Sequence, residues 1–342
     1  MHTPFASLPA PGGTLTVGAG IQWVRMPLPF ALNHVNLWLL EDEGGWAIVD
    51  TGYGTLETMA HWDQLLDTLA QGPRGNHITR ILVTHGHPDH VGLAAWLQDR
   101  TGAPVAMTLG EFYGAQVFWH GLGHSWKQEA LAQFRLHGLP EDRLQAIEAS
   151  RDSYRAGVPH LPRHYQRMLD GDRIEIGGRT WQVHVGHGHS PEHAGLFCAE
   201  AGVFISGDMV LPTITTNVSV PASSPDDDPL ARYLASLDRF QALPDATLVL
   251  PSHGRPFLGL HERLEALRSH HAGRLGILQA ACREPRCAAD VLGDLFGREL
   301  DSHQTIFAMG EAIAHLNHLE HRGSLRRTLG ADGILRFVAI PA

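Results

Sequence analysis

The chain has 342 residues, of which 43% are hydrophobic and 18% charged, and its formal net charge is -10. This length can bury one large core or two smaller ones, and the composition is ordinary for a globular protein. The acidic balance argues against a nucleic-acid-binding surface that covers the whole chain.

Histidines and cysteines are informative only in groups. The 24 histidines exceed what a core needs, so a single histidine is weak evidence for a site. The three cysteines, Cys198, Cys282 and Cys287, are too few for a disulfide framework and predict a reducing compartment.

The first residues contain neither a basic segment nor an apolar one, and no apolar run approaches the length of a membrane span. We therefore expect a cytoplasmic protein without a membrane partner.

Short β-rich runs separated by turn signals open the chain, which is typical of an antiparallel sheet. These runs are Thr14–Val17, Ile21–Met26, Val35–Leu40 and Trp46–Val49. The last run leads into Asp50, and Gly52 and Gly54 follow, where the missing side chains allow tight backbone turns. Asp50 could orient a ligand histidine from behind or could simply cap the turn, and the local sequence leaves both alternatives open.

A strand, helix and strand come next. Apolar residues at helical spacing first predict a helix over 55–71. Ile78–Val83 is then predicted as a buried strand, Val91–Asp99 as a helix and Pro104–Met107 as another strand. This order predicts a βαβ unit, and therefore a mixed sheet with helices packed on it.

The segment Thr84-His85-Gly86-His87-Pro88-Asp89-His90 follows the first strand of this unit. Imidazole nitrogens and carboxylate oxygens are the ligands that zinc and similar divalent ions take. His85 and His87 would point the same way in an extended segment. One metal would find it hard to use all four groups, whereas two adjacent metals could divide them. The segment also stands at the carboxyl end of a strand, where open α/β sheets place their sites.

Residues 109–168 interrupt this alternation with many aromatic side chains and two helix-like runs. The helices are predicted over Gln128–His137 and Glu141–Ser153. We favour a cap that supplies an apolar wall for a substrate. A dimer interface or ordinary core is the alternative, and the sequence does not decide between them.

Strands predicted later in the chain end in histidine or aspartate beside glycine. These strands are predicted over 173–176, 180–185, 195–199, 203–206 and 247–250. The side chains near their ends are His187, His189, His193, Asp208 and His253. Each pattern alone is weak, but together with the segment at 84–90 they predict one shared metal site.

Four motifs carry a resemblance to a known superfamily: THGHPDH (84–90), GHSPEH (188–193), SGD (206–208) and PSHG (251–254). Their order and approximate spacing resemble those of the metallo-β-lactamase-fold hydrolases, which include glyoxalase II, the acyl-homoserine lactonases and RNase Z. The resemblance covers roughly residues 14–265. It implies an α/β protein with an αββα sandwich, here with a helical insertion at 109–168, and a metal-dependent hydrolase.

Carried over position by position, the resemblance implies two divalent metal ions. One ion would be held by His85, His87 and His189, the other by Asp89, His90 and His253, with Asp208 bridging them. His189 is preferred to its neighbouring histidines because the family ligand stands two positions before the proline. Asp89 would also be catalytic, as a proton shuttle. Asp50 matches an aspartate of the family that supports a ligand histidine. Zinc is the expected metal, although histidine and aspartate also accept iron or manganese.

The character of the chain changes after Leu260. Helices are predicted over Leu264–Ala281, Ala288–Phe296 and Ile306–Arg322, and hairpin strands over Ser324–Leu329 and Ile334–Ala339. This order resembles a winged-helix module that follows the catalytic domain in one branch of the superfamily. We therefore predict a catalytic domain at 1–263 and a winged-helix-like domain at 264–342. Arg322, Arg326 and Arg327 could bind nucleic acid, but a packing or dimerisation module agrees better with the acidic residues around them.

A dinuclear site can supply hydroxide at neutral pH. We therefore predict hydrolysis of an ester, thioester or lactone of a small, partly apolar substrate. A phosphodiesterase or endoribonuclease of the same fold is the first alternative, and a non-catalytic metal-binding protein is the second. We expect a small-molecule substrate and no nucleic acid as partners, and leave a homodimer as an open alternative.

Overall fold

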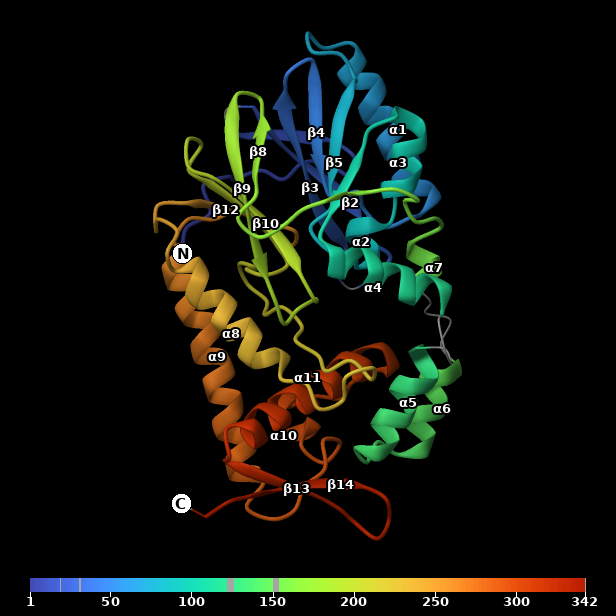
Figure 1. The fold of residues 1–342 in the computed structure, drawn as a ribbon, viewed down its shortest axis with the longest axis vertical. Coiled ribbons are helices and arrows are strands. Elements are labelled where there is room, and N and C mark those ends of the chain that lie inside the picture. The colour runs from blue at the N-terminus through green and yellow to red at the C-terminus, as the bar shows by residue number, and fades with distance from the viewer. Residues whose placement is uncertain (19, 31, 122–125, 150–153, 342) are drawn as a thin grey trace.

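The computed structural model describes residues 1–18, 20–30, 32–121, 126–149 and 154–341. Two β-sheets pack face to face, and helices cover the outer face of each sheet (Figure 1). The layers therefore run helix, sheet, sheet, helix. The α/β class and the αββα sandwich expected from the resemblance are confirmed.

The first sheet has seven strands in chain order. They are β1 (Thr14–Gly18), β2 (Ile21–Pro27), β3 (His34–Asp42), β4 (Gly45–Val49), β5 (Ile78–Leu82), β6 (Val105–Met107) and β7 (Gln166–Arg167). Strands β1 to β4 pair antiparallel, and β4 to β7 pair parallel. The six strands predicted in this part of the chain all form, and β5 and β6 make the predicted parallel βαβ unit.

The second sheet has five strands in the order β12-β11-β10-β9-β8. They are β8 (Arg173–Ile176), β9 (Arg179–Gly186), β10 (His193–Cys198), β11 (Val203–Gly207) and β12 (Leu248–Pro251). Neighbouring strands pair antiparallel except β11 and β12, which are parallel. All five predicted strands are therefore present.

Side chains that alternate between the two faces of a strand explain why the sheets can pack in layers. On β3, Leu37 and Leu39 pack toward the helices on the outer face, whereas Trp38 and Leu40 pack into the core between the sheets. Successive side chains of a strand point to opposite faces. Because both faces of the sheet are covered, this strand is apolar at consecutive positions.

Helices α1 (Leu56–Ala70) and α3 (Ala94–Thr101) cover the first sheet, and α8 (Pro229–Phe240) and α9 (Leu260–Ala281) cover the second. The helix predicted over 91–99 is replaced by two, α2 (Pro88–Val91) and α3. We did not predict α8. Its start signals are nevertheless present, because the Asp228 side chain accepts a hydrogen bond from the Ala231 N–H and Pro229 occupies the first turn.

The insertion forms α4 (Leu109–His120), α5 (Trp126–Leu136), α6 (Glu141–Ala149) and α7 (Tyr154–Gly157). The second helix predicted here extended to Ser153, and positions 150–153 lie outside the described residues. In Figure 1, α5 and α6 stand beside the C-terminal helices, away from the two sheets. Their buried side chains Phe134, Leu144 and Ile147 belong to the core shared with those helices. Part of the insertion therefore packs as core, and the cap that we favoured stays a prediction.

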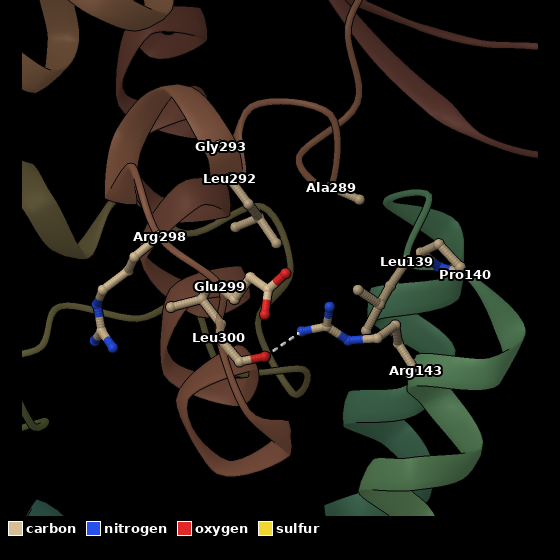
Figure 2. Close-up of a pocket in the computed structure, with 9 residues that line it drawn as sticks. All are labelled: Leu139, Pro140, Arg143, Ala289, Leu292, Gly293, Arg298, Glu299 and Leu300. Carbon is tan, nitrogen blue, oxygen red and sulfur yellow. Dashed lines mark hydrogen bonds between the residues drawn. The ribbon is translucent and has the colours of Figure 1, made fainter.

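A small cavity of about 270 Å³ lies between this helical pair and the C-terminal part of the chain and is lined by residues of both (Figure 2). Arg143 of α6 reaches across and donates hydrogen bonds to the carbonyl of Leu300 and the hydroxyl of Thr305. The insertion is thus tied to the C-terminal part by polar contacts as well as by apolar packing.

Three helices and a hairpin close the chain in the predicted order. After α9 come α10 (Leu292–Phe296), α11 (Ser302–His321), β13 (Leu325–Leu329) and β14 (Leu335–Ala339). Helix α10 is shorter than predicted. Helix α9 packs both on the second sheet and against α11, so one continuous helix belongs to both parts. The boundary at 263/264 and the winged-helix assignment stay predictions.

A buried polar group joins α9 to α11. Nδ1 of His271 lies 3.0 Å from Nε2 of His315, and Nδ1 of His315 donates to the Glu311 carbonyl at 2.8 Å. Because that carbonyl can only accept, His315 presents its bare Nε2 and His271 donates to it. Burial lowers the pKa of His271 to about 3 and that of His315 to about 4, so both imidazoles are neutral.

All three cysteines are buried and unpaired, in agreement with the predicted absence of disulfides. Within the described ranges, no helix combines the length and the apolar character that crossing a bilayer requires.

Candidate metal centre

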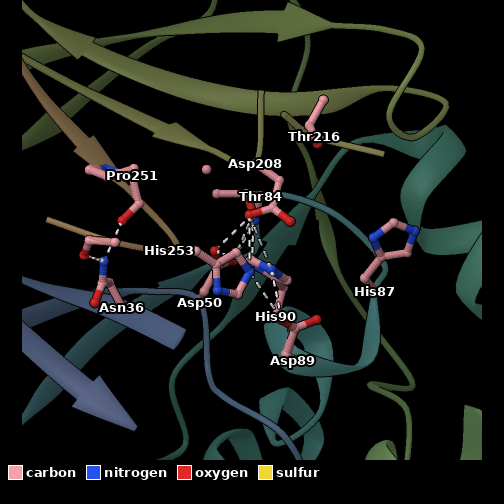
Figure 3. A network of polar contacts seen from close by, with 12 residues as sticks. Asn36, Asp50, Thr84, His87, Asp89, His90, Asp208, Thr216, Pro251 and His253 are labelled. Atoms are coloured by element: carbon pink, nitrogen blue, oxygen red, sulfur yellow. Dashed lines mark hydrogen bonds and ion pairs between the residues drawn. The ribbon is translucent and has the colours of Figure 1, made fainter. Parts of the chain in front are cut away.

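Loops at one end of the sandwich bring together the seven side chains that the motifs singled out. They are His85, His87, Asp89 and His90 after β5, His189 after β9, Asp208 after β11 and His253 after β12. Strands β4 and β5 are parallel in one sheet, and β11 and β12 are parallel in the other. The carboxyl ends of parallel strands meet at the same edge, and here the edges of two sheets face one another. Figure 3 shows five of these side chains, from both sheets, around one space.

His85, His87 and His189 form a first trio of facing nitrogens. Nε2 of His85 lies 2.9 Å from Nδ1 of His87 and 3.2 Å from Nε2 of His189. The other nitrogen of His189 donates to the Asn217 carbonyl at 2.9 Å, which leaves its Nε2 lone pair directed at the trio. Burial lowers the pKa of all three imidazoles, that of His87 to about 3. Three neutral nitrogens that face one point suit a bound cation.

Asp89, His90 and His253 form a second trio. Oδ2 of Asp89 lies 3.5 Å from Nε2 of His90 and 3.4 Å from Nε2 of His253. Each imidazole donates its other N–H away from the centre, His90 to Asp50 at 2.8 Å and His253 to the His34 carbonyl at 2.9 Å. Among the described residues, the buried Nε2 of His90 finds no hydrogen-bond partner, as expected for a ligand atom.

Asp208 lies between the two trios. Its Oδ1 is 3.4 Å from Nε2 of His253 and 3.7 Å from Nε2 of His90, whereas its Oδ2 is 3.5 Å from Nε2 of His189. One carboxylate oxygen therefore faces each trio. This is the arrangement that a bridging ligand of two metals needs.

The histidines of the second trio and the carboxylates of Asp89 and Asp208 shift each other's pKa values. Burial by itself would lower the pKa of His253, but the Asp208 and Asp89 carboxylates outweigh it and raise that pKa to about 10. Burial by itself would raise the pKa of Asp208, but His253 and His90 hold it well below its ordinary value. The centre thus keeps its carboxylates ionised at neutral pH.

Asp50 supports ligands from behind rather than facing the centre. It accepts hydrogen bonds from the Thr84 N–H at 2.8 Å, from the Thr84 hydroxyl and from Nδ1 of His90. Because the Thr84 hydroxyl donates to Asp50, it accepts from Nδ1 of His85 at 3.0 Å. Asp50 therefore orients His90 directly and His85 through Thr84.

His187 and His189 follow β9 and His193 begins β10, and the three side chains have different surroundings. His189 faces the first trio, whereas Nδ1 of His187 lies 2.7 Å from the Pro191 carbonyl near the surface. His193 is fully buried, and its Nε2 accepts a hydrogen bond from the Asp208 N–H at 3.1 Å. Of the three, His189 is the one whose Nε2 lies against another ligand candidate, His85.

Sequence reasoning missed two residues at the centre. Thr84 begins the histidine segment, so its position was an available signal. Glu111, in the first turn of α4, is 2% exposed and bonds the loops of the first trio. Burial raises the pKa of its carboxyl. A lone glutamate in an insertion has no sequence signal that would have identified it.

Comparison with known proteins connects this geometry to a family. A family model described as the metallo-beta-lactamase superfamily matches residues 31–253, and one described as a metallo-beta-lactamase-like, C-terminal domain matches residues 275–340. These matches confirm the resemblance seen in the motifs.

Individual relatives and a solved structure point to the same family. The chain is 26% identical over 306 residues to a probable metallo-hydrolase, YqjP, of Bacillus subtilis, covering 87% of this chain and 91% of that protein. It is 30% identical over 229 residues to a hydroxyacylglutathione hydrolase of Albidiferax ferrireducens, covering 67% and 65%. Among solved structures, a beta-lactamase domain protein from Burkholderia ambifaria is 45% identical, with a TM-score of 0.92 and coverage of 99% and 98%.

Proposed function

The chain belongs to the metallo-beta-lactamase superfamily and is a metal-dependent hydrolase, and we propose that it holds two divalent metal ions and cleaves an ester, thioester or lactone of a small, partly apolar substrate. The placement of Asp208 carries this proposal. Its two oxygens face the two trios separately, and a single-metal site would not need a carboxylate there. The first trio would hold one metal, the second trio would hold the other, and Asp208 would bind both.

Bound metals would supply an activated water at neutral pH, since two adjacent ions lower the pKa of a shared water toward about 7. The chain's own residues would orient the water and move its proton. Asp89 is only partly buried, and its Oδ2 lies within 3.5 Å of both His90 and His253. We assign Asp89 the role of accepting the proton of the attacking water and delivering it to the leaving group.

Aromatic side chains flank the histidine segment and support a partly apolar substrate. Phe118 of α4 is 42% exposed and stacks on Tyr154, whose hydroxyl donates to the Gly86 carbonyl at 2.5 Å. On another side, Phe30 is 38% exposed and packs edge-on against Tyr53. Exposed rings of this kind are typical of a surface that binds apolar groups. One relative, a hydroxyacylglutathione hydrolase, is itself named for an acyl substrate.

The donor set supports zinc as the metal. Imidazole and carboxylate are the usual ligands of catalytic zinc, although iron and manganese accept the same groups. We also propose a cytoplasmic location, because three unpaired thiols suit a reducing compartment.

Nucleic acid is not part of the proposed function. Arg327, one of the arginines considered for it, already forms ion pairs with Asp226 and Glu320. Two acidic partners reduce the positive charge that a phosphate backbone would need.

A metal analysis combined with a substrate panel tests the proposal. We expect two metal ions per chain and turnover of at least one ester, thioester or lactone, with loss of turnover in the presence of a chelator. A β-lactam and an RNA oligonucleotide complete the panel. Cleavage of RNA alone would overturn the substrate class, and one metal or none per chain would overturn the dinuclear site.

A further inference from the structure

The backbone of Gly86, the residue between His85 and His87, is held on both its N–H and its carbonyl by the insertion. Oε2 of Glu111 accepts a hydrogen bond from the Gly86 N–H at 2.7 Å. The Tyr154 hydroxyl donates to the Gly86 carbonyl at 2.5 Å. Both backbone polar groups of the residue that separates two ligand candidates are therefore bonded to side chains from distant parts of the sequence.

The second oxygen of Glu111 reaches the other loop of the first trio. Oε1 accepts a hydrogen bond from the Glu192 N–H at 2.8 Å, three positions after His189. The Glu192 carboxylate in turn accepts from the Gly110 N–H at 2.8 Å. One carboxylate thus spans the loop that carries His85 and His87 and the loop that carries His189.

Because Glu111 is buried, its carboxylate depends on the hydrogen bonds that it accepts from the two loops. Glu111 is 2% exposed, and an ionisable group in that position is costly unless its oxygens are satisfied. Both oxygens are satisfied by backbone N–H groups of the two loops. Space is also limited, because a side chain at Gly86 would approach the Glu111 carbonyl and Ala115 of α4. The loops have little freedom to move apart while Glu111 is in place.

The link involves only one of the two trios. His85, His87 and His189 lie on the loops that Glu111 bonds, whereas Asp89 and His90 lie on α2 and His253 follows β12. His90 has its own support in Asp50. Asp50 also reaches His85 through Thr84, whereas the hydrogen bonds of Glu111 go only to the loops of the first trio.

We propose that Glu111 is a positioning residue that sets the distance between His85 and His189, and that it controls metal affinity at the first trio without affecting the second. This inference rests on the proposed dinuclear function. Its readout is metal affinity, which does not depend on knowing the substrate.

The test uses Glu111→Gln, which keeps the size of the side chain but replaces one acceptor by an amide that faces a backbone N–H. The substitution is made in a His253→Ala background, where the first trio stays intact, and in a His189→Ala background, where the second trio stays intact. Zinc affinity is measured by competition with a chelator. We expect affinity to fall by about 10- to 100-fold in the first background, the size typical of lost support behind a ligand. It should stay within about twofold in the second background, since no bond from Glu111 reaches that trio.

Glu192→Gln is the matched control, because it removes a neighbouring carboxylate charge while keeping an acceptor for Gly110. We expect it to leave zinc affinity unchanged in both backgrounds. Wild-type affinity in Glu111→Gln, an equal loss in both backgrounds, or an equal loss in Glu192→Gln would each overturn the inference. Zinc binding with normal stoichiometry in the parent chain would in those cases leave the proposed function standing.

Tyr154→Phe keeps the inference testable if Glu111→Gln does not fold. It removes only the hydroxyl that holds the Gly86 carbonyl, and it should weaken zinc binding in the His253→Ala background alone. Unchanged affinity there would overturn the inference. A wild-type chain that binds no metal would instead overturn the proposed function.

Discussion

Oδ2 of Asp50 lies 2.8 Å from Nδ1 of His90, although the two residues come from different strand ends. Within the part of the chain that the structure describes, Asp50 is the only non-glycine residue with a positive φ, 62°. Aspartate and asparagine tolerate this left-handed conformation better than other residues that carry a side chain. The backbone is therefore held in an uncommon geometry at the position where a carboxylate supports a ligand candidate, which agrees with a functional role.

Asp50→Asn should weaken metal binding at the second trio by about 10- to 100-fold. The substitution preserves the backbone conformation, but its amide cannot both accept from Thr84 and accept from His90 as the carboxylate does. Affinity is measured by chelator competition in the His189→Ala background. Asp42→Asn is the control, because Asp42 is also buried and accepts hydrogen bonds from Thr79 and Gly177 far from the centre. Equal losses in the two variants would argue against a specific role for Asp50.

Asp208→Ala should reduce metal content from two ions per chain to one or fewer and abolish turnover. The reason is that each of its oxygens faces a different trio, so both metals lose a ligand. Metal content is measured by elemental analysis after dialysis against metal-free buffer. A variant that kept two metals and full activity would contradict the bridging role.

Gly92→Ala should destabilise the chain by about 1–3 kcal/mol, the usual cost of overpacking. A methyl group at Gly92 would overlap with the carbonyl oxygens of Pro88, Gly52 and Gly157, and α2, which carries Asp89 and His90, would have to move. Gly273→Ala is the control. Gly273 lies within α9 with open space around it, and alanine there should stabilise the helix by about 0.5–1 kcal/mol. Thermal unfolding of both variants measures the two stability changes, which should have opposite signs.

Acid should destabilise the contact between α9 and α11 between pH 6.5 and pH 4. The folded pKa values of His271, about 3, and His315, about 4, lie below the ordinary value of 6.5. Below pH 6.5 the unfolded chain therefore binds protons that the folded chain does not, and stability present above pH 6.5 is lost as the pH falls. The slope is about 1.4 kcal/mol per pH unit for each histidine that stays neutral in the folded state.

His271→Leu/His315→Leu isolates this effect, because Arg274, His270 and Glu311, which also face the pair, remain in place. Melting temperatures from pH 4 to 7 should show a smaller slope in the double variant than in the wild type. His160→Leu, at an exposed position, should keep the wild-type slope. An unchanged slope in the double variant would contradict the prediction.

The strands and ligand candidates could be predicted because their signals are local. A short strand is visible as an apolar run between turn residues, as at Val203–Ile205 between Gly202 and Gly207. Histidine and aspartate reveal metal chemistry by their residue type and spacing alone. The segment from His85 to His90 therefore indicated a metal site before any contact was known.

The tertiary structure alone decided which side chains support that site. Glu111 lies 25 positions from Gly86, and Asp208 lies 45 positions before His253, so no local pattern relates them. The sequence by itself predicted strands, helices and a metal-binding segment from periodicity and residue chemistry, and the resemblance of its four motifs implied the αββα sandwich and the seven candidate ligands. Packing of two sheets and an insertion determined how far apart the trios lie, how each oxygen of Asp208 faces a different trio and how α5 and α6 pack in a core, because those distances arise only when remote segments meet.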